Sequence, residues 1–246
     1  MGVAVVKRTA VIAGVGPLQG LGGALCLGAG QEGLHVVVAG RTLEKLNKVV
    51  AAITAAGGEA TAMVCDVTEE TQVVELIATA ESIAPVHLAI FNAGNNMPGS
   101  FLEVEARHFE KCWKIACYGG FLFAREALRA MAARQSGCLL FTGASASMRG
   151  RPGYAAFTAA KGGLRNLAQS LAREFQPQGV HVGHVVIDGG IYGEKIEKLV
   201  PDWYAEQGEE GLIGLQGIVD AYMHLYRQPR NAWTHELDLR THQESF

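Results

Sequence analysis

The stretch AVIAGVGPLQGLGGAL, residues 10–25, decides the fold of this 246-residue chain. It begins with a short apolar run and continues through a loop that holds Gly14, Gly16, Gly20 and Gly22. Beyond the loop, residues 21–31 have the length and apolar content of a helix. Glycines between a strand and a helix let backbone N–H groups approach a diphosphate at the helix N-terminus, where the helix dipole favours anions. The stretch therefore predicts a strand, an anion-binding loop and a helix.

The rest of the chain repeats this alternation of short apolar runs and helix-length segments. The expected strands span residues 10–13, 35–39, 60–65, 88–91, 138–142, 181–186 and 233–240. The expected helices span residues 21–31, 43–56, 69–83, 106–134 (one or two helices), 154–175 and 218–227. Continuously apolar strands rich in Val and Ile are typical of a sheet buried on both faces. The pattern predicts an α/β fold with a Rossmann-like, doubly wound parallel sheet in three layers.

One segment interrupts the alternation. Residues 191–212, IYGEKIEKLVPDWYAEQGEEGL, are charged and aromatic and follow the last long apolar strand. Two interpretations remain open, a mobile lid over a substrate site and a pair of surface helices. We see no linker or repeat, and 246 residues suit one large α/β domain, so residues 1–246 are expected to form a single domain.

Composition narrows the class of protein further. Hydrophobic residues make up 49% of the chain and the formal net charge is −3, so we expect neither nucleic-acid nor membrane-surface binding. The apolar run near the N-terminus ends in the glycine loop and does not fit a signal peptide. The five cysteines and eight histidines show no metal-ligand spacing, so we expect buried free thiols and no metal. A cytoplasmic location is the corresponding expectation.

Several motifs in order along nearly the whole chain resemble the short-chain dehydrogenase/reductase family. The glycine loop follows the first strand, Asn92-Ala93-Gly94 follows the fourth, and PGYAAFTAAKGGLRNLAQSLARE, residues 152–174, resembles the family's active-site helix. The family pattern Gly-x-x-x-Gly-x-Gly fits Gly16, Gly20 and Gly22. A first glycine at Gly14, directly after the expected strand end, makes the loop two residues longer, and we favour this assignment.

The resemblance implies a nicotinamide cofactor at the carboxyl edge of the sheet. Family members that prefer NAD(H) carry an acid at the end of the second strand, where this chain has Arg41, so NADP(H) is favoured over NAD(H). A solvated arginine at a helix start is the alternative. The family aspartate at Asp66, followed by Val67, implies an adenine contact, although a helix N-cap also explains an aspartate there. Leu21 at the helix start and Gly189 after the sixth strand complete the expected cofactor-binding residues.

The catalytic positions depart from the family pattern. The family uses Asn, Ser, Tyr and Lys, and residue counting places Ala116, Ala144, Phe157 and Lys161 at these positions. A phenyl ring has no O–H group, so Phe157 can neither donate nor accept a proton. Of the four family residues, only the lysine is present in this chain. In the family this lysine holds the nicotinamide ribose and lowers the tyrosine pKa.

Two other side chains are candidates to replace the missing groups. Tyr154 lies seven residues before Lys161, and seven steps of about 100° return to nearly the same helix face. Tyr-x6-Lys is also the spacing of a divergent branch that includes enoyl-acyl-carrier-protein reductases, which have the longer glycine loop. Plain packing of Tyr154 is the equal alternative. Ser145 lies one residue from the usual serine position, although strand alternation turns it the other way.

These residues suggest a function and leave a rival open. The leading interpretation is an NADP(H)-dependent oxidoreductase that transfers hydride to or from an activated C=C bond or carbonyl of a small-molecule substrate. The rival is a catalytically silent NADP(H)-binding protein that acts as a sensor or assembly partner; carbonyl chemistry with water as the proton donor is a weaker third possibility. The family also pairs through the helices that correspond to residues 106–134 and 154–175, which implies a homodimer or homotetramer.

Overall fold

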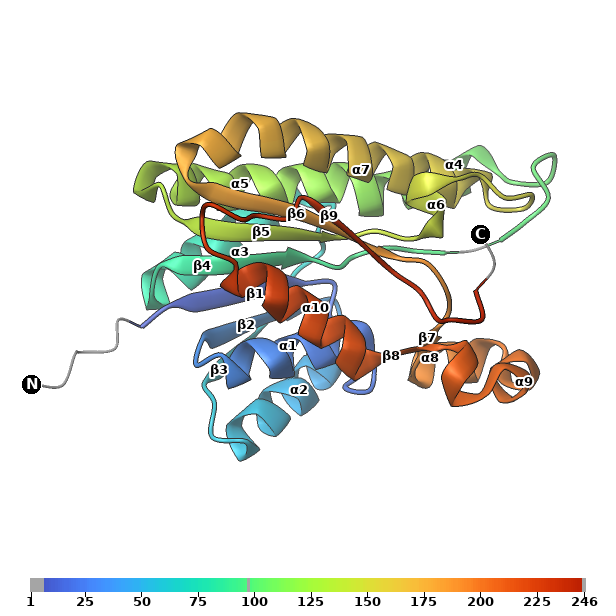
Figure 1. Ribbon diagram of the computed structural model, residues 1–246, viewed down its shortest axis with the longest axis horizontal. Coiled ribbons are helices and arrows are strands. Elements are labelled where there is room, and N and C mark those ends of the chain that lie inside the picture. Colours follow the sequence, from blue (N-terminus) through green and yellow to red (C-terminus); the bar gives the residue numbers. More distant parts are fainter. Residues whose placement is uncertain (1–6, 97, 245–246) are drawn as a thin grey trace, which may run out of the picture.

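A seven-stranded, all-parallel sheet forms the centre of the computed structural model, which describes residues 7–96 and 98–244 (Figure 1). The strand order is β3-β2-β1-β4-β5-β6-β9. The strands are β1 (Thr9–Ala13), β2 (His35–Gly40), β3 (Ala60–Val64), β4 (Val86–Phe91), β5 (Gly137–Thr142), β6 (Val180–Ile187) and β9 (Glu236–Leu239). This confirms the predicted doubly wound α/β fold, and residues 1–6, which precede β1, lie outside the described residues.

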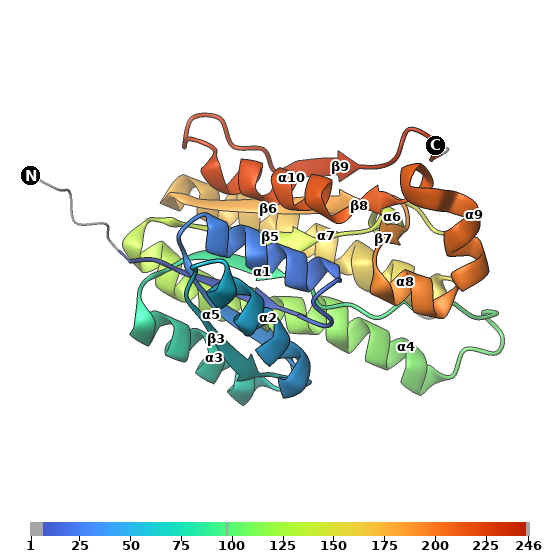
Figure 2. The same cartoon turned by 90° about the horizontal axis from the view of Figure 1, so that it is seen from below.

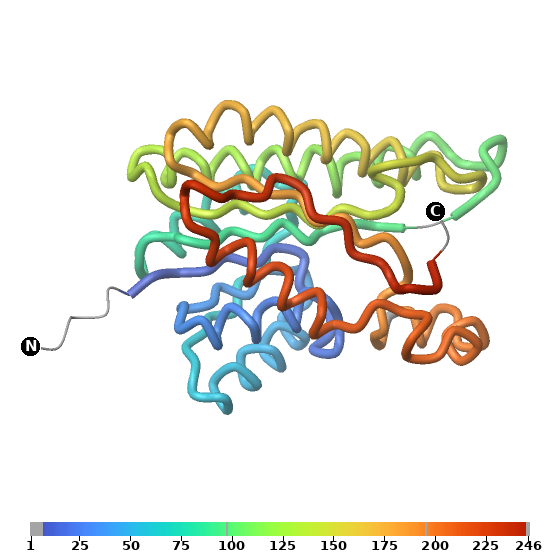
Figure 3. Tube along the Cα trace, in the orientation of Figure 1, coloured from blue at the N-terminus to red at the C-terminus, as the bar shows by residue number. Residues whose placement is uncertain are grey.

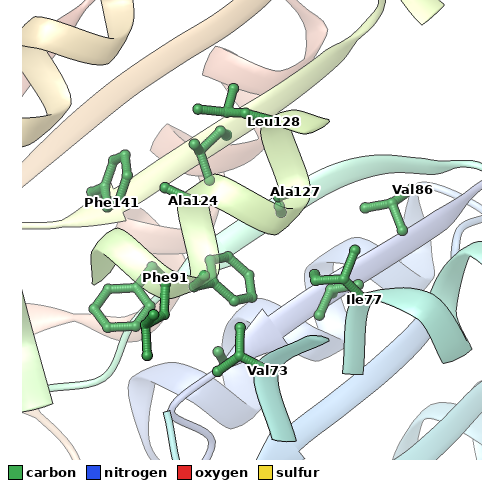
Figure 4. Packing of buried hydrophobic residues seen from close by; sticks show 14 of the residues in the cluster. Val73, Ile77, Val86, Phe91, Ala124, Ala127, Leu128 and Phe141 are labelled. Carbon is green, nitrogen blue, oxygen red and sulfur yellow. The ribbon is translucent and has the colours of Figure 1, made fainter. Parts of the chain in front are cut away.

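Helices cover both faces of the sheet, as the view from below shows (Figure 2). One layer contains α3 (Glu70–Ile83), α4 (Ala106–Trp113), α5 (Gly119–Arg134) and α7 (Ala155–Phe175). The other contains α1 (Leu21–Gln31), α2 (Leu43–Ala55) and α10 (Leu215–Arg227). Each layer buries its own apolar core against the sheet. Figure 4 shows the first core, where Phe91 and Phe141 of the sheet meet Ala124 and Leu128 of α5 and Val73 of α3.

The strand order reverses direction beside β1. Strand β1 pairs with β2 on one side and with β4 on the other, so the chain leaves β1 toward one edge and later returns to continue toward the opposite edge. Ligands of open parallel sheets bind outside the carboxyl ends of the strands at such a reversal. The glycine loop after β1 and the Asn92-Ala93-Gly94 segment after β4 both lie there.

Three local features differ from the expected pattern. The helix expected over residues 106–134 is interrupted by a π-helical segment, Lys114–Tyr118, which separates α4 from α5. A one-turn helix, α6 (Ser145–Met148), follows β5 where no element was expected. Residues 191–212 form β7 (Ile191–Tyr192), α8 (Glu194–Leu199) and α9 (Pro201–Gly211), and Ile213–Gly214, as β8, pairs with β7. The segment therefore has the helix pair of one interpretation, and its motion as a lid stays a prediction.

The chain returns to the carboxyl edge of the sheet after β9. The tube trace shows this last segment running back past the end of β6 (Figure 3). Its Glu244 lies beside Gly189 in the turn after β6, and its Gln243 lies beside Gly211 at the end of α9. The C-terminal segment thus borders the same edge of the sheet as the glycine loop.

Candidate active site

The turn after β1 needs glycine at its first position. Gly14 has φ +89°, a conformation that L side chains rarely adopt, and a Cβ atom there would lie 2.4 Å from the backbone nitrogen of Ala93. At Gly16, by contrast, a Cβ atom would meet nothing within 4 Å. The tight approach of the two strand ends therefore falls at Gly14, which is the position expected for the longer loop.

The loop delivers the chain to the N-terminus of α1. Gly20 is the N-cap residue and Leu21, the first helical residue, is buried. No side chain in the described part of the chain caps this helix, and its first turn contains no acidic residue. A Cβ atom on Gly22 would lie 2.9 Å from the Cα atom of Val15. The close packing holds the loop against the helix while the first N–H groups of α1 are left without a side-chain acceptor.

A buried hydrogen-bond chain ties together the strand ends beside the loop. The Asn92 side-chain amide donates to the carbonyl of Gly14 (3.2 Å), and the Thr142 hydroxyl donates to Asn92 Oδ1 (3.1 Å). The Tyr222 hydroxyl from α10 lies 2.7 Å from the Thr142 hydroxyl and donates to it, since the Thr142 proton is used for Asn92. Desolvation raises the pKa of the fully buried Tyr222. These bonds fix the ends of β1, β4 and β5 relative to one another.

Lys161 places a buried ammonium group at this edge of the sheet. Its side chain projects from α7, is 4% exposed, and donates from Nζ to the backbone carbonyl of Thr142 at 2.7 Å. A Cβ atom on Gly94 would lie 3.3 Å from Nζ, so only glycine leaves this side of the ammonium uncrowded. A buried charge is costly unless it is bonded, and this ammonium is bonded to the Thr142 carbonyl. Ala93, beside Gly94, is buried between Gly14 and the lysine-facing turn.

The other candidate catalytic residues are not brought to the lysine by hydrogen bonds. The Phe157 ring centroid lies 5.9 Å from Lys161 Nζ, one turn away on α7. Tyr154 is the N-cap residue of α7, with backbone angles outside the helix, so it begins the predicted stripe from just before the first turn. Ser145 starts α6. Within residues 7–96 and 98–244, the hydroxyls of Tyr154 and Ser145 donate no hydrogen bond that joins them to Lys161.

Sequence reasoning missed an ion-pair cluster at the end of β6. Asp188 is fully buried and accepts two hydrogen bonds from the Arg149 guanidinium, at 2.8 and 2.9 Å. Arg240, just after β9, lies 3.1 Å from the same carboxylate. The cluster anchors the segment after α6 and the C-terminal segment to the turn that carries Gly189. Asp188 is therefore structural, and only its position before a glycine hinted at this role.

A buried histidine on β6 contacts both the neighbouring strand β9 and the segment after β5. His184 on β6 is fully buried, and its Nδ1 lies 2.9 Å from Glu236 Oε2. Glu236 also binds the Arg165 guanidinium through two bonds of 2.7 Å. Desolvation lowers the pKa of His184 to about 4, so the ring is neutral at pH 7. Its Nε2 faces Gly143, where a Cβ atom would lie 2.4 Å away, so the ring underpins the segment between Thr142 and Ala144.

Arg41 and Asp66 lie together at the opposite end of the site. Both line a cavity of about 260 Å³ beyond the ends of β2 and β3. Asp66 Oδ1 accepts hydrogen bonds from the backbone N–H and the hydroxyl of Thr68, at 3.0 and 2.8 Å. The N-cap residue of α3 is Glu69, so the proposed capping role of Asp66 is wrong, although Asp66 does stabilise the turn before that helix. Val67, next to it, is buried.

The segment from β7 to β8 closes against the turn after β6. A Cβ atom on Gly190 would lie 2.6 Å from the Trp203 ring, so the indole of α9 rests directly on that glycine. The backbone N–H of Glu194 donates to the carbonyl of Gln19 in the glycine loop (3.1 Å). The rings of Tyr192 and Tyr204 stack with their centroids 5.1 Å apart. These contacts join the segment to both the glycine loop and the β6 turn.

Together, the glycine loop at a strand-order reversal and the parallel sheet define an α/β protein of the Rossmann type. Comparison with known proteins agrees. The family model described as short chain dehydrogenase matches residues 8–198. The chain therefore belongs to the short-chain dehydrogenase family, which is a family of oxidoreductases.

Individual relatives extend over nearly the full length. An uncharacterized oxidoreductase of Listeria monocytogenes is 30% identical over 213 residues, which cover 86% of each chain. The crystal structure of a short-chain dehydrogenase from Rhodopseudomonas palustris is 36% identical, with a TM-score of 0.82, and covers 96% of this chain and 99% of that one. A 3-oxoacyl (acyl-carrier-protein) reductase from Agrobacterium tumefaciens, solved with NADP bound, has a TM-score of 0.85 at 23% identity and covers 96% and 93%.

Two further observations concern the chain as a whole. All five cysteines are free thiols; Cys117 is half-buried and the other four are buried. Across the described ranges, no helix has both the length and the apolar character that spanning a membrane requires.

Proposed function

We propose that the protein is an NADP(H)-dependent oxidoreductase that transfers hydride between the cofactor and an activated C=C bond or carbonyl of a small organic substrate. The buried Lys161 ammonium, bonded to Thr142 and facing Gly94 at the carboxyl edge of the sheet, is the observation that carries this proposal. When bound, the nicotinamide supplies or accepts the hydride. The chain's own residues bind the cofactor, orient the substrate and donate the proton.

The residues present fit such a cofactor. Gly14 and Gly94 leave backbone surfaces that a Cβ atom would fill, and the uncapped N-terminus of α1 offers N–H groups for a diphosphate. Arg41 and Asp66 line a cavity at the far end, where an adenosine with a 2′-phosphate would lie. The NADP-bound relative of similar fold supports the nicotinamide cofactor, and Arg41 supports the preference for NADP(H) over NAD(H).

In this proposal Lys161 is a binding residue. Its ammonium donates to the Thr142 carbonyl and lies beside Gly94, where a Cβ atom would be 3.3 Å from Nζ. The direction toward Gly94 suits the ribose hydroxyls of the nicotinamide half. The Tyr222–Thr142–Asn92 chain holds that carbonyl and the glycine loop in register, so it positions the lysine without touching substrate.

We propose Tyr154 as the proton donor to the substrate oxygen. Reducing an activated C=C bond needs an enolate oxygen to be stabilised, which one positioned hydroxyl supplies, and a positioned general acid contributes about 10²–10⁴ in rate. The half-buried Tyr154 flanks the same end of α7 as Phe157 and Lys161. Ser145, at the start of α6, is the second candidate for polarising the oxygen.

One observation favours the non-catalytic alternative. The aromatic ring closest along the helix to Lys161 is that of Phe157, which has no proton to give. A silent NADP(H)-binding protein, acting as a sensor or assembly partner, would keep the lysine and the glycine loop for binding while losing the acid. The two functions therefore differ at Tyr154 and agree everywhere else in the site.

The distinguishing experiment is NADPH oxidation with panels of enones and of activated ketones, using wild type, Tyr154→Phe and Phe157→Tyr. We expect turnover with an enone substrate, a loss of at least about tenfold in Tyr154→Phe, and unchanged NADPH binding in that variant. NADPH binding without turnover in both wild type and Tyr154→Phe would favour the silent protein. Phe157→Tyr is the matched variant, since it adds a hydroxyl beside the lysine without changing the number of carbons.

We also propose a homodimer or homotetramer that pairs through the layer of α4, α5 and α7. The exposed aromatic side chains Phe109, Trp113 and Phe121 follow one another along α4 and α5. An apolar groove of about 330 Å³ lies between α5 and α7 and includes Leu128 and Leu167. Sedimentation velocity tests the proposal, and a monomer at micromolar concentration would contradict it.

A further inference from the structure

The cavity beyond β2 and β3 carries more positive than negative charge. It is lined by one residue from the β2 end, two from the β3 end and five from the α4 region: Arg41, Asp66, Thr68, Arg107, Glu110, Lys111, Lys114 and Ile115. Four of these side chains are cations and two are carboxylates. The cavity therefore suits an anion, and the α4 side of its wall supplies most of the positive charge.

Three of the six charged side chains in this wall form ion pairs. Lys114 Nζ lies 2.9 Å from Glu110, four residues before it, and Arg107 pairs with Glu105, two residues before it. The Asp66 carboxylate accepts hydrogen bonds from the hydroxyl and N–H of Thr68, which are neutral donors and leave its negative charge in the wall. The two cations that remain are Arg41 and Lys111, since neither forms an ion pair with any residue in the described ranges.

Arg41 and Lys111 reach the cavity from different elements. Arg41 follows β2 directly, whereas Lys111 lies in the last turn of α4, one helical turn before Ile115, which also lines the cavity. Cys112, the residue after Lys111 on α4, is buried in the protein interior. Lys111 of α4 and Ile115 of the π-helical segment that follows therefore line the cavity about one turn apart.

We propose that Lys111 is a specificity-determining residue that binds the 2′-phosphate of the dinucleotide together with Arg41. A phosphomonoester dianion carries two charges, and Arg41 and Lys111 supply two cations that form no ion pair in the described ranges, against the single unpaired carboxylate of Asp66. Arg41 binds through its planar fork and Lys111 as a point charge from α4, while Ile115 offers an apolar surface beside them. This inference rests on the proposed function, which it deepens by assigning part of the NADP(H) preference to α4.

The test measures the dissociation constants of NADPH, NADH and 2′,5′-ADP for wild type, Lys111→Gln and Lys48→Gln. Lys48 is the matched control, because it is exposed on α2 and pairs with Glu44 away from the cavity. Exposed charge pairs contribute about 1 kcal/mol or less, so we expect Lys111→Gln to weaken NADPH and 2′,5′-ADP by about fivefold and to leave NADH unchanged. The effect shrinks at 0.5 M salt, because screening weakens exposed charge interactions.

The outcomes separate this inference from the proposed function. Unchanged NADPH and 2′,5′-ADP affinities in Lys111→Gln, in a protein that binds NADPH more tightly than NADH, would overturn the role of Lys111 and leave the proposed function standing. An equal loss for NADPH and NADH would also overturn it, since that result points to a general effect on the site. Failure of wild type to bind NADPH, NADH and 2′,5′-ADP would overturn both.

Discussion

Replacing Lys161 with methionine should weaken cofactor binding while leaving the fold almost as stable as before. Methionine has nearly the same length as the lysine stem and fills the same space on α7, but it removes the ammonium. The substitution deletes the 2.7 Å bond from Nζ to the Thr142 carbonyl and the approach of Nζ to the Phe157 ring. It also removes a charge that the protein holds at 4% exposure.

The two effects on stability oppose each other. A hydrogen bond from a charged donor contributes about 1.5–3 kcal/mol, and burying an ammonium costs several kcal/mol, so we expect the free energy of unfolding to change by less than about 1.5 kcal/mol. Cofactor binding has no such compensation. Losing one charge-assisted bond to the ribose removes about 1.5–3 kcal/mol of binding free energy, which raises the dissociation constant by roughly ten- to hundredfold.

The assay pairs urea unfolding of the protein without cofactor with NADPH titration followed by fluorescence. Lys198→Met is the control, because Lys198 is exposed and pairs with Glu194 on α8. A loss of more than about 3 kcal/mol of unfolding free energy in Lys161→Met, together with wild-type NADPH affinity, would contradict this prediction. That result would make the lysine a structural residue.

Three further predictions concern the supports of the site. Gly190→Ala should displace the indole of Trp203, red-shift the tryptophan fluorescence and lower the free energy of unfolding by about 1–3 kcal/mol. Gly217→Ala is the control, because a Cβ atom there meets open space. We expect it to raise the free energy of unfolding by about 0.5–1 kcal/mol in the same urea titration. The folded-state pKa of His184 is about 4, below the unfolded value of 6.5, so the unfolded chain binds more protons between these two pH values. The neutral His184 therefore contributes about 3 kcal/mol to the free energy of unfolding above pH 6.5, and this contribution is lost as the pH falls to 4. His184→Phe should flatten that part of the stability–pH curve, and an unchanged curve would contradict the assignment. Tyr222→Phe should cost about 1–2 kcal/mol, since a buried hydroxyl bond is removed, and an unchanged urea midpoint would show that this bond contributes nothing.

The sequence predicts the fold well because its signals are local. The apolar runs locate the central strands to within about two residues, and the helix expected over residues 21–31 is found as Leu21–Gln31. The requirement for glycine at position 14 is also visible in the sequence, because a strand that ends in a glycine loop needs a turn there. These features depend on neighbours along the chain.

The missed parts depend on residues far apart in the sequence. Tyr222 meets Thr142 across 80 positions, and Asp188 meets Arg149 across 39. No periodicity reports such contacts, since a single tyrosine or aspartate has the same local pattern whether its partner is water or a buried side chain. The π-helical segment Lys114–Tyr118, which is followed directly by Gly119, is likewise not indicated by the apolar spacing of residues 106–134.

Calorimetric titration of this 246-residue chain with NADPH and with NADH tests whether the protein binds NADP(H). We expect one NADPH bound per chain, with an affinity at least about tenfold higher than that for NADH, since Arg41 and Lys111 line the cavity in which we propose that the 2′-phosphate binds. Binding of neither dinucleotide, or tighter binding of NADH than of NADPH, would contradict it.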